Sequence, residues 1–303
     1  MREFRGKITY RDAVLGARRY LADHARSTEA GAPGAVETPF LDALVLLAHA
    51  VGATKEQVLA RYPEPLAPEA PKVKEDFARL LERRIAGEPV SYLVGHKAFF
   101  DIELLVDHRV LVPRPETEIL VEFGLRALEE TALCDRRPRV LDLCTGSGAV
   151  ACALATHRPD VFVVATDLSR DALSVAMENA TRVGVSERIE FAEGDLYAPV
   201  EGLFDLILAN PPYLSASEYG VLEQASWPEP KMALEAGERG LEIIERLVKG
   251  AVDHLQKKGY LGVECGTGQA TEVANMLESV GFGKVDTLRD LANRDRVVIG
   301  RYE

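Results

Sequence analysis

Short apolar runs alternate with longer helical stretches through the second half of this chain, and this alternation limits the possible folds more than any other feature. The runs cover residues 140–143, 161–165, 189–192, 204–208 and 260–263. Runs this short between helical stretches are typical of a parallel sheet with helices on its faces. Two further runs, 284–288 and 296–302, are separated only by a loop and should pair antiparallel. The sequence therefore predicts an α/β fold with a seven-stranded, mostly parallel sheet ending in an antiparallel hairpin.

The first part of the chain has a different period. Between about residues 8 and 86 the apolar residues recur three and four positions apart, which predicts a bundle of four or five short helices. With 303 residues, of which 47% are hydrophobic, the chain can build more than one core. We expect a helical domain over 1–88, a linking β-hairpin over 89–113 and an α/β domain over 114–303. The bundle carries no chemical motif, so a partner-binding module and a packing support are equally good interpretations.

The hairpin is predicted from two apolar segments on either side of a polar turn. Residues 99–106 and 110–112 should be its strands and residues 107–109 its turn. Two prolines then end the second strand. Glu116 and Thr117 should open the next helix, where capping is the simplest role for them.

Charge and cysteine content disfavour several classes of function. The 36 basic and 48 acidic residues give a formal net charge of −12, which argues against a general affinity for nucleic-acid backbones. The four cysteines form neither a C-x-x-C pair nor a cluster with histidine, so we expect no metal site, no disulfide framework and a reducing, cytoplasmic setting. The chain shows no apolar signal core and no long apolar segment, so neither export nor membrane insertion is expected.

A glycine-containing loop follows the first predicted strand and leads into a helix. Glycines at this place let the backbone pass close to a ligand at the carboxyl end of the sheet. The candidate cofactor-binding residues of the loop are Cys144, Thr145, Gly146, Ser147 and Gly148. Ala151 stands where the dinucleotide fingerprint permits alanine, so the spacing alone does not exclude NAD. The loop predicts a nucleotide site without identifying the nucleotide.

Acidic residues end the next two predicted strands. Asp167 stands where a carboxylate can accept hydrogen bonds from both ribose hydroxyls of a nucleoside, and Leu168 beside it is included in the predicted cofactor site. Asp195 and Leu196 end the third strand, where the acid can meet an adenine amino group and the leucine can pack on the ring. A helix cap at Asp167 and a simple turn at Asp195 are the structural alternatives.

Asn210, Pro211, Pro212 and Tyr213 directly follow the fourth apolar run and indicate a reaction. A planar nitrogen that is to be alkylated needs acceptors for its N–H groups, and Asn210 offers a side-chain carbonyl oxygen. Pro211 offers a backbone carbonyl without a competing N–H, Pro212 stiffens the turn, and Tyr213 offers a flat face for stacking. Such residues are also common in strand-ending turns. Glycine loop, acid, acid and Asn-Pro-Pro-Tyr in this order are rarely produced by chance turns, so we interpret the four residues as catalytic.

These motifs resemble those of the release-factor glutamine methyltransferases of the PrmC/HemK family, and the resemblance covers nearly the whole chain. Several amino-methylating enzymes share the Asn-Pro-Pro-Tyr motif, whereas other stretches resemble this family in particular. They are residues 87–95 and 112–118, Glu229 with Pro230, Ala233 with Leu234, Gly240 with Leu241, Asp290 with Leu291, and 294–296. The resemblance implies the Rossmann-like fold of S-adenosylmethionine-dependent methyltransferases, S-adenosyl-L-methionine as cofactor, and an N-terminal bundle that helps to dock the protein substrate.

The resemblance also assigns residues by position. It places Thr145, Gly146 and Gly148 in the cofactor loop, Asp167 at the ribose, and Asn210 to Tyr213 at the acceptor glutamine. The residues that would line the donor site are Phe100, Arg114, Glu116 and Thr117. Cys144 and Leu196 depart from the family pattern, where a glycine and an aromatic residue are common.

The implied reaction is methylation of the side-chain nitrogen of the glutamine in the Gly-Gly-Gln loop of class 1 peptide chain release factors. Sister enzymes that modify a glutamine of a ribosomal protein, and adenine-type nucleic-acid N-methyltransferases, are the enzymatic alternatives. A cofactor-sensing protein without turnover is the non-catalytic one. In-line displacement needs positioning and charge placement, so no nucleophilic side chain and no dedicated base are expected. The expected partner is a release factor, with no direct nucleic acid and no membrane.

Overall fold

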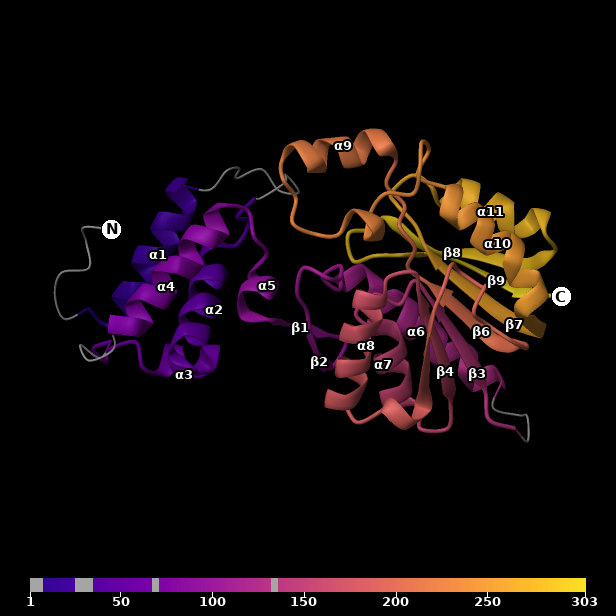
Figure 1. Ribbon diagram of the computed structural model, residues 1–303, viewed down its shortest axis with the longest axis horizontal. Helices are drawn as coiled ribbons and strands as arrows, with labels where there is room; N and C mark the ends of the chain where they lie inside the picture. Colours follow the sequence, from indigo (N-terminus) through magenta and orange to yellow (C-terminus); the bar gives the residue numbers. More distant parts are fainter. Residues whose placement is uncertain (1–7, 25–34, 67–70, 132–135) are drawn as a thin grey trace. The chain divides into compact units, whose positions relative to one another are not determined.

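The computed structural model describes residues 8–24, 35–66, 71–131 and 136–303, which form two compact units (Figure 1). The first unit comprises the described residues up to Gly95 together with Leu222–Pro228. The second comprises the described parts of His96–Val221 and Glu229–Glu303. No helix within the described ranges combines the length and apolar character needed to cross a membrane.

Short helices build the first unit within its described residues. They are α1 (Tyr10–His24), α2 (Pro39–Val51), α3 (Lys55–Ala60), α4 (Pro71–Ile85) and α5 (Val90–Val94). Val14, Ala17 and Leu21 on one face of α1 are fully buried, as the three- and four-residue spacing predicts. Thr54 begins α3 with a capping box, in which its hydroxyl accepts the N–H of Gln57 and its own N–H donates to the Gln57 side chain. The expected helical bundle is present.

A seven-stranded sheet is the centre of the second unit, in the order β5-β4-β3-β6-β7-β9-β8 (Figure 1). Its strands are β3 (Arg139–Leu143), β4 (Phe162–Asp167), β5 (Ile189–Glu193), β6 (Phe204–Ala209), β7 (Leu255–Glu264), β8 (Phe282–Arg289) and β9 (Asp295–Tyr302). Strands β3 to β7 run parallel, and β9 pairs antiparallel with both β7 and β8. The predicted sheet and its antiparallel end are confirmed. The sequence did not predict that β9 lies between β7 and β8.

Strand β7 begins earlier than its apolar run suggests. Leu255 pairs with Phe204, the register then shifts, and Tyr260 pairs with Leu206. Lys258 lies in the irregular part and has a positive φ of 67°. The polar residues between the two paired segments conceal the first half of the strand from a search for apolar runs.

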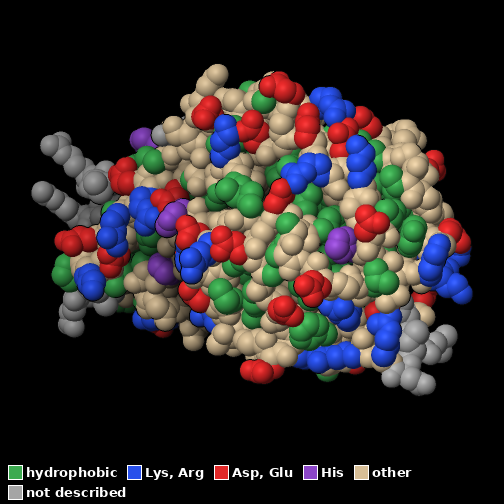
Figure 2. Space-filling view, turned by 45° about the vertical axis from the view of Figure 1, so that its right-hand side comes forward, with side chains coloured by type: hydrophobic (Ala, Val, Ile, Leu, Met, Phe, Trp, Pro, Cys, Tyr) green, Lys and Arg blue, Asp and Glu red, His purple; other side chains and the backbone are tan. Residues whose placement is uncertain are grey.

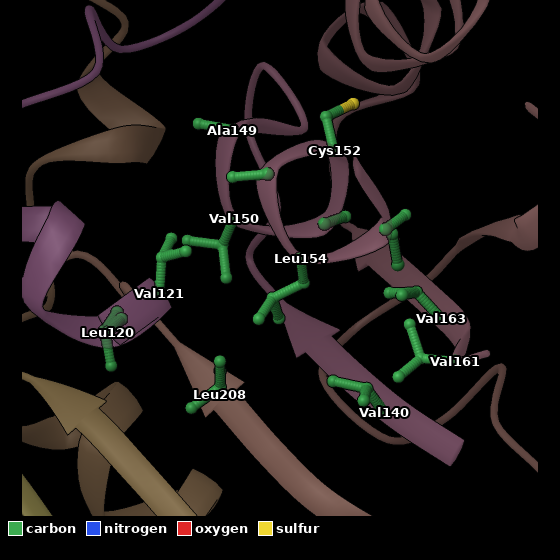
Figure 3. Packing of buried hydrophobic residues seen from close by; sticks show 14 of the residues in the cluster. Leu120, Val121, Val140, Ala149, Val150, Cys152, Leu154, Val161, Val163 and Leu208 are labelled. Atoms are coloured by element: carbon green, nitrogen blue, oxygen red, sulfur yellow. The ribbon is translucent and has the colours of Figure 1, made fainter. Parts of the chain in front are cut away.

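Alternate residues of the central strands face two helical layers. The helices of this unit are α6 (Glu118–Thr131), α7 (Ala149–His157), α8 (Arg170–Arg182), α9 (Ala216–Gln224), α10 (Glu242–His254) and α11 (Ala270–Ser279), with 3-10 turns at Pro115–Thr117, Ser186–Arg188 and Lys231–Ala233. Val140, Val163 and Leu208 pack with α6 and α7, as Figure 3 shows. Leu141 and Ile207, one residue away in their strands, pack with α10 and α11. Strands buried on both faces need continuous apolar runs, which explains the pattern in the sequence.

The β-hairpin lies earlier in the chain than predicted. Its strands are β1 (His96–Phe99) and β2 (Ile102–Leu105), so the chain reverses at Phe100 and not at residues 107–109. Residues 107–109 do form a turn, in which the Asp107 carboxylate accepts the N–H of Arg109 at 2.9 Å, but no strand follows it. The apolar residues after this turn are largely buried without being paired in a sheet. An apolar run therefore indicated burial here and was wrongly interpreted as a strand.

Asn179 of α8 links the hairpin to the loop that follows β3. Its side-chain oxygen accepts the N–H of Leu105 at 2.6 Å, and its amide nitrogen donates to the carbonyls of Leu105 at 3.0 Å and Ser147 at 2.9 Å. The side chain is fully buried, so water cannot replace these bonds. A buried polar group with satisfied partners holds the elements that it joins in one arrangement.

Asn179→Ala should lower the free energy of unfolding by about 2–4 kcal/mol, because it removes the side-chain hydrogen bonds of three backbone groups that are buried or part-buried. Asn275→Ala makes the same change on the exposed side of α11 and should cost no more than about 0.5 kcal/mol. Urea unfolding followed by circular dichroism measures both. Equal losses in the two variants would contradict the role of Asn179.

Candidate active site

The carboxyl ends of the parallel strands border a cavity of about 420 Å³ in the second unit. This volume lies in the range of about 300–1,000 Å³ that is typical of small-molecule sites. The predicted site residues that line the cavity are Thr117, Cys144, Thr145, Gly146, Ser147, Asp167, Leu168, Asp195, Leu196, Asn210 and Pro212. The predicted site residues outside its lining are Phe100, Arg114, Glu116, Gly148, Pro211 and Tyr213.

The loop after β3 turns through residues with left-handed backbone conformation. Cys144, Gly146 and Gly148 have φ angles of 58°, 54° and 78°. Glycine adopts such angles without strain, which explains why the family named above usually has a glycine in place of Cys144. Gly148 has a second constraint, because a Cβ there would lie 3.0 Å from the Cβ of Ala176 in α8. Gly148 therefore permits the close approach of α7 and α8 and shapes the loop from outside the cavity.

Hydrogen bonds to the next strand hold this loop. The N–H of Thr145 donates to the carbonyl of Thr166 at 2.9 Å, and the N–H of Gly146 donates to the Asp167 carboxylate at 2.8 Å. The other Asp167 oxygen accepts the N–H of Ser169 at 2.8 Å. It is the Ser169 side chain that caps α8, so Asp167 is not the helix cap. Burial raises the pKa of Asp167. Its carboxylate thus joins two strand ends while lining the cavity.

Asp142 is a buried carboxyl under the loop that was not selected from the sequence. It accepts a hydrogen bond from the Thr145 hydroxyl at 2.5 Å and one from the N–H of Ala151 at 3.2 Å. Burial raises its pKa to about 7. The signal was present, since a carboxyl inside an apolar strand must find a partner nearby. Its contacts show that it shapes the glycine loop.

The third strand end supplies one charged and one apolar side chain. The Asp195 carboxylate pairs with Arg246 of α10 at 2.5 Å, so it already has a partner within the protein. Leu196 is buried and has a φ of 51°. Leu168, at the neighbouring strand end, is 55% exposed although it lines the cavity. It offers an apolar surface for a planar ring. An adenine contact at Asp195 stays a prediction.

Asn210 lies at the end of β6, close to Thr117. Its side-chain nitrogen donates to the Thr117 hydroxyl oxygen at 3.1 Å. Within the described part of the chain, the side-chain oxygen of Asn210 has no hydrogen-bond partner, so it is available to a ligand. Thr117 ends the 3-10 turn directly before α6, and a capping role for it there stays a prediction. Thr117 orients the amide of Asn210.

The backbone after Asn210 is fixed by two residues from later in the chain. The Gln269 side-chain nitrogen donates to the carbonyl of Tyr213 at 3.0 Å. Gly240, with a φ of 76°, lies so close that a Cβ there would be 2.5 Å from the same carbonyl oxygen. Pro211 is buried, and burial raises the pKa of the Tyr213 hydroxyl, which therefore stays neutral. The turn has one defined shape before any substrate arrives.

Three residues implied by the family resemblance do not line the cavity. Phe100 packs edge-on against a histidine of α7 at the hairpin turn. Arg114 pairs at 2.5 Å with the buried carboxylate of Glu229, and Glu116 pairs with Arg294 at 3.1 Å. The two ion pairs hold the segment that carries Thr117.

The cavity walls also contain residues outside the predicted site. Residues 108–111, Pro230, Met232 and Ala233 line it. Pro230 and Ala233 belong to the stretches that resemble the family, whereas residues 108 and 109 were interpreted only as part of a turn. The lining contains five acidic residues, Asp142, Asp167, Asp171, Asp195 and Glu235. Arg109 is the arginine in the described lining. Acidic walls favour a cation. Among the described residues no three potential metal ligands form a cluster.

A glycine loop, a strand-end carboxylate and an exposed leucine suit a nucleoside, and acidic walls suit one that carries a sulfonium. Together with the sheet order, these features define an S-adenosylmethionine-dependent methyltransferase. Residues 118–225 match the family model of the methyltransferase small domain, and residues 18–95 match that of the PrmC N-terminal domain. The chain belongs to the release factor glutamine methyltransferase family.

Similarity to individual proteins supports this membership. The release factor glutamine methyltransferase of Neisseria gonorrhoeae is 40% identical over 89% of this chain and 96% of its own length. That of Moorella thermoacetica is 39% identical over 88% of this chain and 92% of its own. The solved hMettl16 catalytic domain in complex with MAT2A 3'UTR hairpin 6 has a TM-score of 0.54 and 14% identity, covering 66% of this chain and 76% of that chain. This last likeness shows the fold alone.

Asp167→Ala should weaken the binding of S-adenosylmethionine by about 1–3 kcal/mol, because it removes a charged hydrogen-bond acceptor from the cavity and frees the N–H of Gly146. Isothermal titration calorimetry gives the Kd. Glu193→Ala removes an exposed carboxylate at the end of β5, outside the cavity lining, and should keep the Kd of the unchanged protein. An unchanged Kd in Asp167→Ala would remove this residue from the cofactor site.

Gly240→Ala should slow methyl transfer more than it weakens cofactor binding, because the new Cβ displaces the backbone of Tyr213. Gly184→Ala is the matched control, since Gly184 has the same φ of 76° but no atom within 4 Å of the added Cβ. The control should lose about 1 kcal/mol of stability and keep its activity. Equal methyl-transfer rates in the two variants would show that the turn after Asn210 need not be fixed.

Proposed function

We propose that this enzyme transfers a methyl group from S-adenosylmethionine to the side-chain nitrogen of the glutamine in the Gly-Gly-Gln motif of class 1 peptide chain release factors. The family membership supports the choice of glutamine as acceptor and of a release factor as substrate. The geometry around Asn210 supports an amide as the acceptor group.

The observation that carries the proposal is the fixed orientation of the Asn210 amide. Its nitrogen donates to Thr117, so its oxygen faces a ligand as an acceptor. A glutamine side chain presents two N–H groups, and its nitrogen lone pair is delocalised into the carbonyl. Two acceptors are needed to hold both N–H groups. We propose the backbone carbonyl of Pro211 as the second acceptor. Tyr213 supplies the face on which the planar amide stacks.

The chemistry divides between cofactor and protein. When bound, S-adenosylmethionine supplies an electrophilic methyl group on a positively charged sulfur. The protein binds and orients the acceptor, and hydrogen bonds from the substrate N–H groups to Asn210 and Pro211 favour a tetrahedral nitrogen. The acidic walls of the cavity stabilise positive charge. The extra proton of a methylated amide nitrogen is acidic enough to leave for solvent, so no side chain is assigned as a base.

The N-terminal helices are our candidate for docking the protein substrate. Residues 18–95, most of the first unit, match the PrmC N-terminal domain, whereas the described cavity lies in the second unit. The reaction should take place in the cytoplasm, where release factors act. On the face shown in Figure 2, lysine and arginine side chains are scattered among acidic ones, which suits a protein partner better than a phosphate backbone.

Mixing the protein with methyl-labelled S-adenosylmethionine and a class 1 release factor tests the proposal. Label should enter the release factor and should disappear when the glutamine of its Gly-Gly-Gln motif is replaced by alanine. A ribosomal protein or nucleic acid should take up no label under the same conditions. Label on either of these instead, or on nothing, would contradict the proposed substrate.

Asn210→Ala should lower turnover by on the order of a hundredfold or more while leaving S-adenosylmethionine binding nearly unchanged, because it removes a hydrogen bond that positions the acceptor. Single-turnover methylation and calorimetry measure the two effects. Asn275→Ala, on the exposed side of α11, is the control and should behave as the unchanged protein. Undiminished turnover in Asn210→Ala would exclude Asn210 from the acceptor site.

A further inference from the structure

Three side chains connect the core of the sheet to the acceptor site. Glu264 ends β7 and is buried, with 1% of its surface exposed. Ala209 of β6 lies opposite Val263 of β7, so Asn210 and Glu264 follow at neighbouring strand ends. The Thr117 hydroxyl lies close enough to the Glu264 carboxyl to lower its pKa, and the hydroxyl oxygen accepts from the Asn210 side-chain nitrogen at 3.1 Å. The Oε2 atom of Glu264 is buried and has no hydrogen-bond partner. A carboxyl in such surroundings costs stability, so its presence calls for a functional explanation.

The number of hydrogen atoms available to Glu264 and Thr117 decides the orientation of the Asn210 amide. An ionised carboxylate only accepts hydrogen bonds, and the Thr117 hydroxyl has one hydrogen to give. When Glu264 takes that hydrogen, the hydroxyl oxygen can only accept, so Asn210 must turn its NH₂ group toward Thr117. The Asn210 oxygen then faces the substrate. When Glu264 is protonated and donates to Thr117, the hydroxyl hydrogen is released, and the opposite orientation of the Asn210 amide becomes possible.

We propose that Glu264 is a positioning residue for methyl transfer, and that its negative charge, acting through the Thr117 hydroxyl, holds the Asn210 oxygen toward the acceptor nitrogen. The inference rests on the proposed function of Asn210. It assigns a catalytic purpose to a buried acid that touches neither cofactor nor acceptor, since Glu264 does not line the cavity.

The surroundings of Glu264 bring its pKa close to neutral pH. Burial raises its pKa to about 7, against the Thr117 hydrogen bond and the nearby positive charges, which lower it. The titratable and charged groups that face it are Arg114 and Glu116 of the turn before α6, Tyr213 after β6, Cys265 after β7, and Arg296 in β9. The ionised fraction therefore changes most steeply near neutral pH.

The expected pH dependence has a definite sign. The active form requires an ionised Glu264, so the methyl-transfer rate should rise with pH through about 7. Between pH 6 and pH 8 the ionised fraction of such a group grows about tenfold, and so should the rate. Stability should show the opposite trend. A folded pKa raised from 4.5 stabilises the protein fully below about pH 4.5, and this contribution is lost as the pH rises through about 7.

Single-turnover rates with S-adenosylmethionine already bound, measured from about pH 6 to pH 8.5, test the proposal in Glu264→Gln. This variant should lose the rise in rate near pH 7, should be about tenfold slower than the unchanged protein at pH 8.5, and should keep its cofactor Kd. Because glutamine is neutral at every pH, the melting temperature of Glu264→Gln at pH 8 should be no lower than that of the unchanged protein. Glu278→Gln, on the exposed side of α11, controls for the loss of one charge and should keep the unchanged profile.

A second pair of variants tests the link through Thr117. Thr117→Val removes the hydroxyl with little change of shape and should lower the rate and flatten the pH profile, whereas Thr117→Ser should restore both. A persisting rise near pH 7 in Glu264→Gln, or normal activity in Thr117→Val, would overturn the inference and would assign the titration to another group such as Asp142. Failure of the proposed function is separate, because the unchanged protein would then place no label on the release factor at any pH.

Discussion

Parallel pairing of β3 with β4 and with β6 is the constraint on which the rest of the site depends. Parallel strands end at the same edge of a sheet, so Asp142, Asp167 and Asn210, which are far apart in the chain, come to one place. Each strand is buried on both faces, and a slip of register by one residue would turn these polar groups into an apolar layer. The packing of the core therefore sets the geometry of the edge.

Buried polar side chains then convert this edge into a defined site. Asn179 bridges the hairpin and the cofactor loop, Glu229 holds the segment before α6, and Gln269 holds the carbonyl of Tyr213. Each of them satisfies a backbone group outside the strands and helices, at Ser147, Val112 and Tyr213 respectively. Loops fixed in this way need no reordering when a substrate binds, which lowers the entropic cost of an oriented reaction.

Much of this arrangement could be predicted from the sequence, because the signals are local. Strands covered on both faces must be apolar throughout, a glycine loop must follow the first of them, and Asn210 must follow a buried strand. The hairpin could not be located, because the apolar residues after Arg109 are buried without pairing. The position of β9 between β7 and β8 could not be predicted either, since the sequence of a strand does not identify the strand with which it pairs. From the sequence, Glu264 indicates only that a buried acid needs a partner. The sequence does not identify Thr117, which lies beside Glu264 in the structure but is far away in the chain.

The central claim is that a glutamine side chain binds with its nitrogen against the Asn210 oxygen. A crystal structure of the protein with S-adenosylhomocysteine and a peptide containing Gly-Gly-Gln tests this most directly. The account predicts the glutamine nitrogen within about 3 Å of the Asn210 side-chain oxygen, with its amide plane on Tyr213. A glutamine bound elsewhere, or an Asn210 amide that turns its nitrogen toward the peptide, would contradict it.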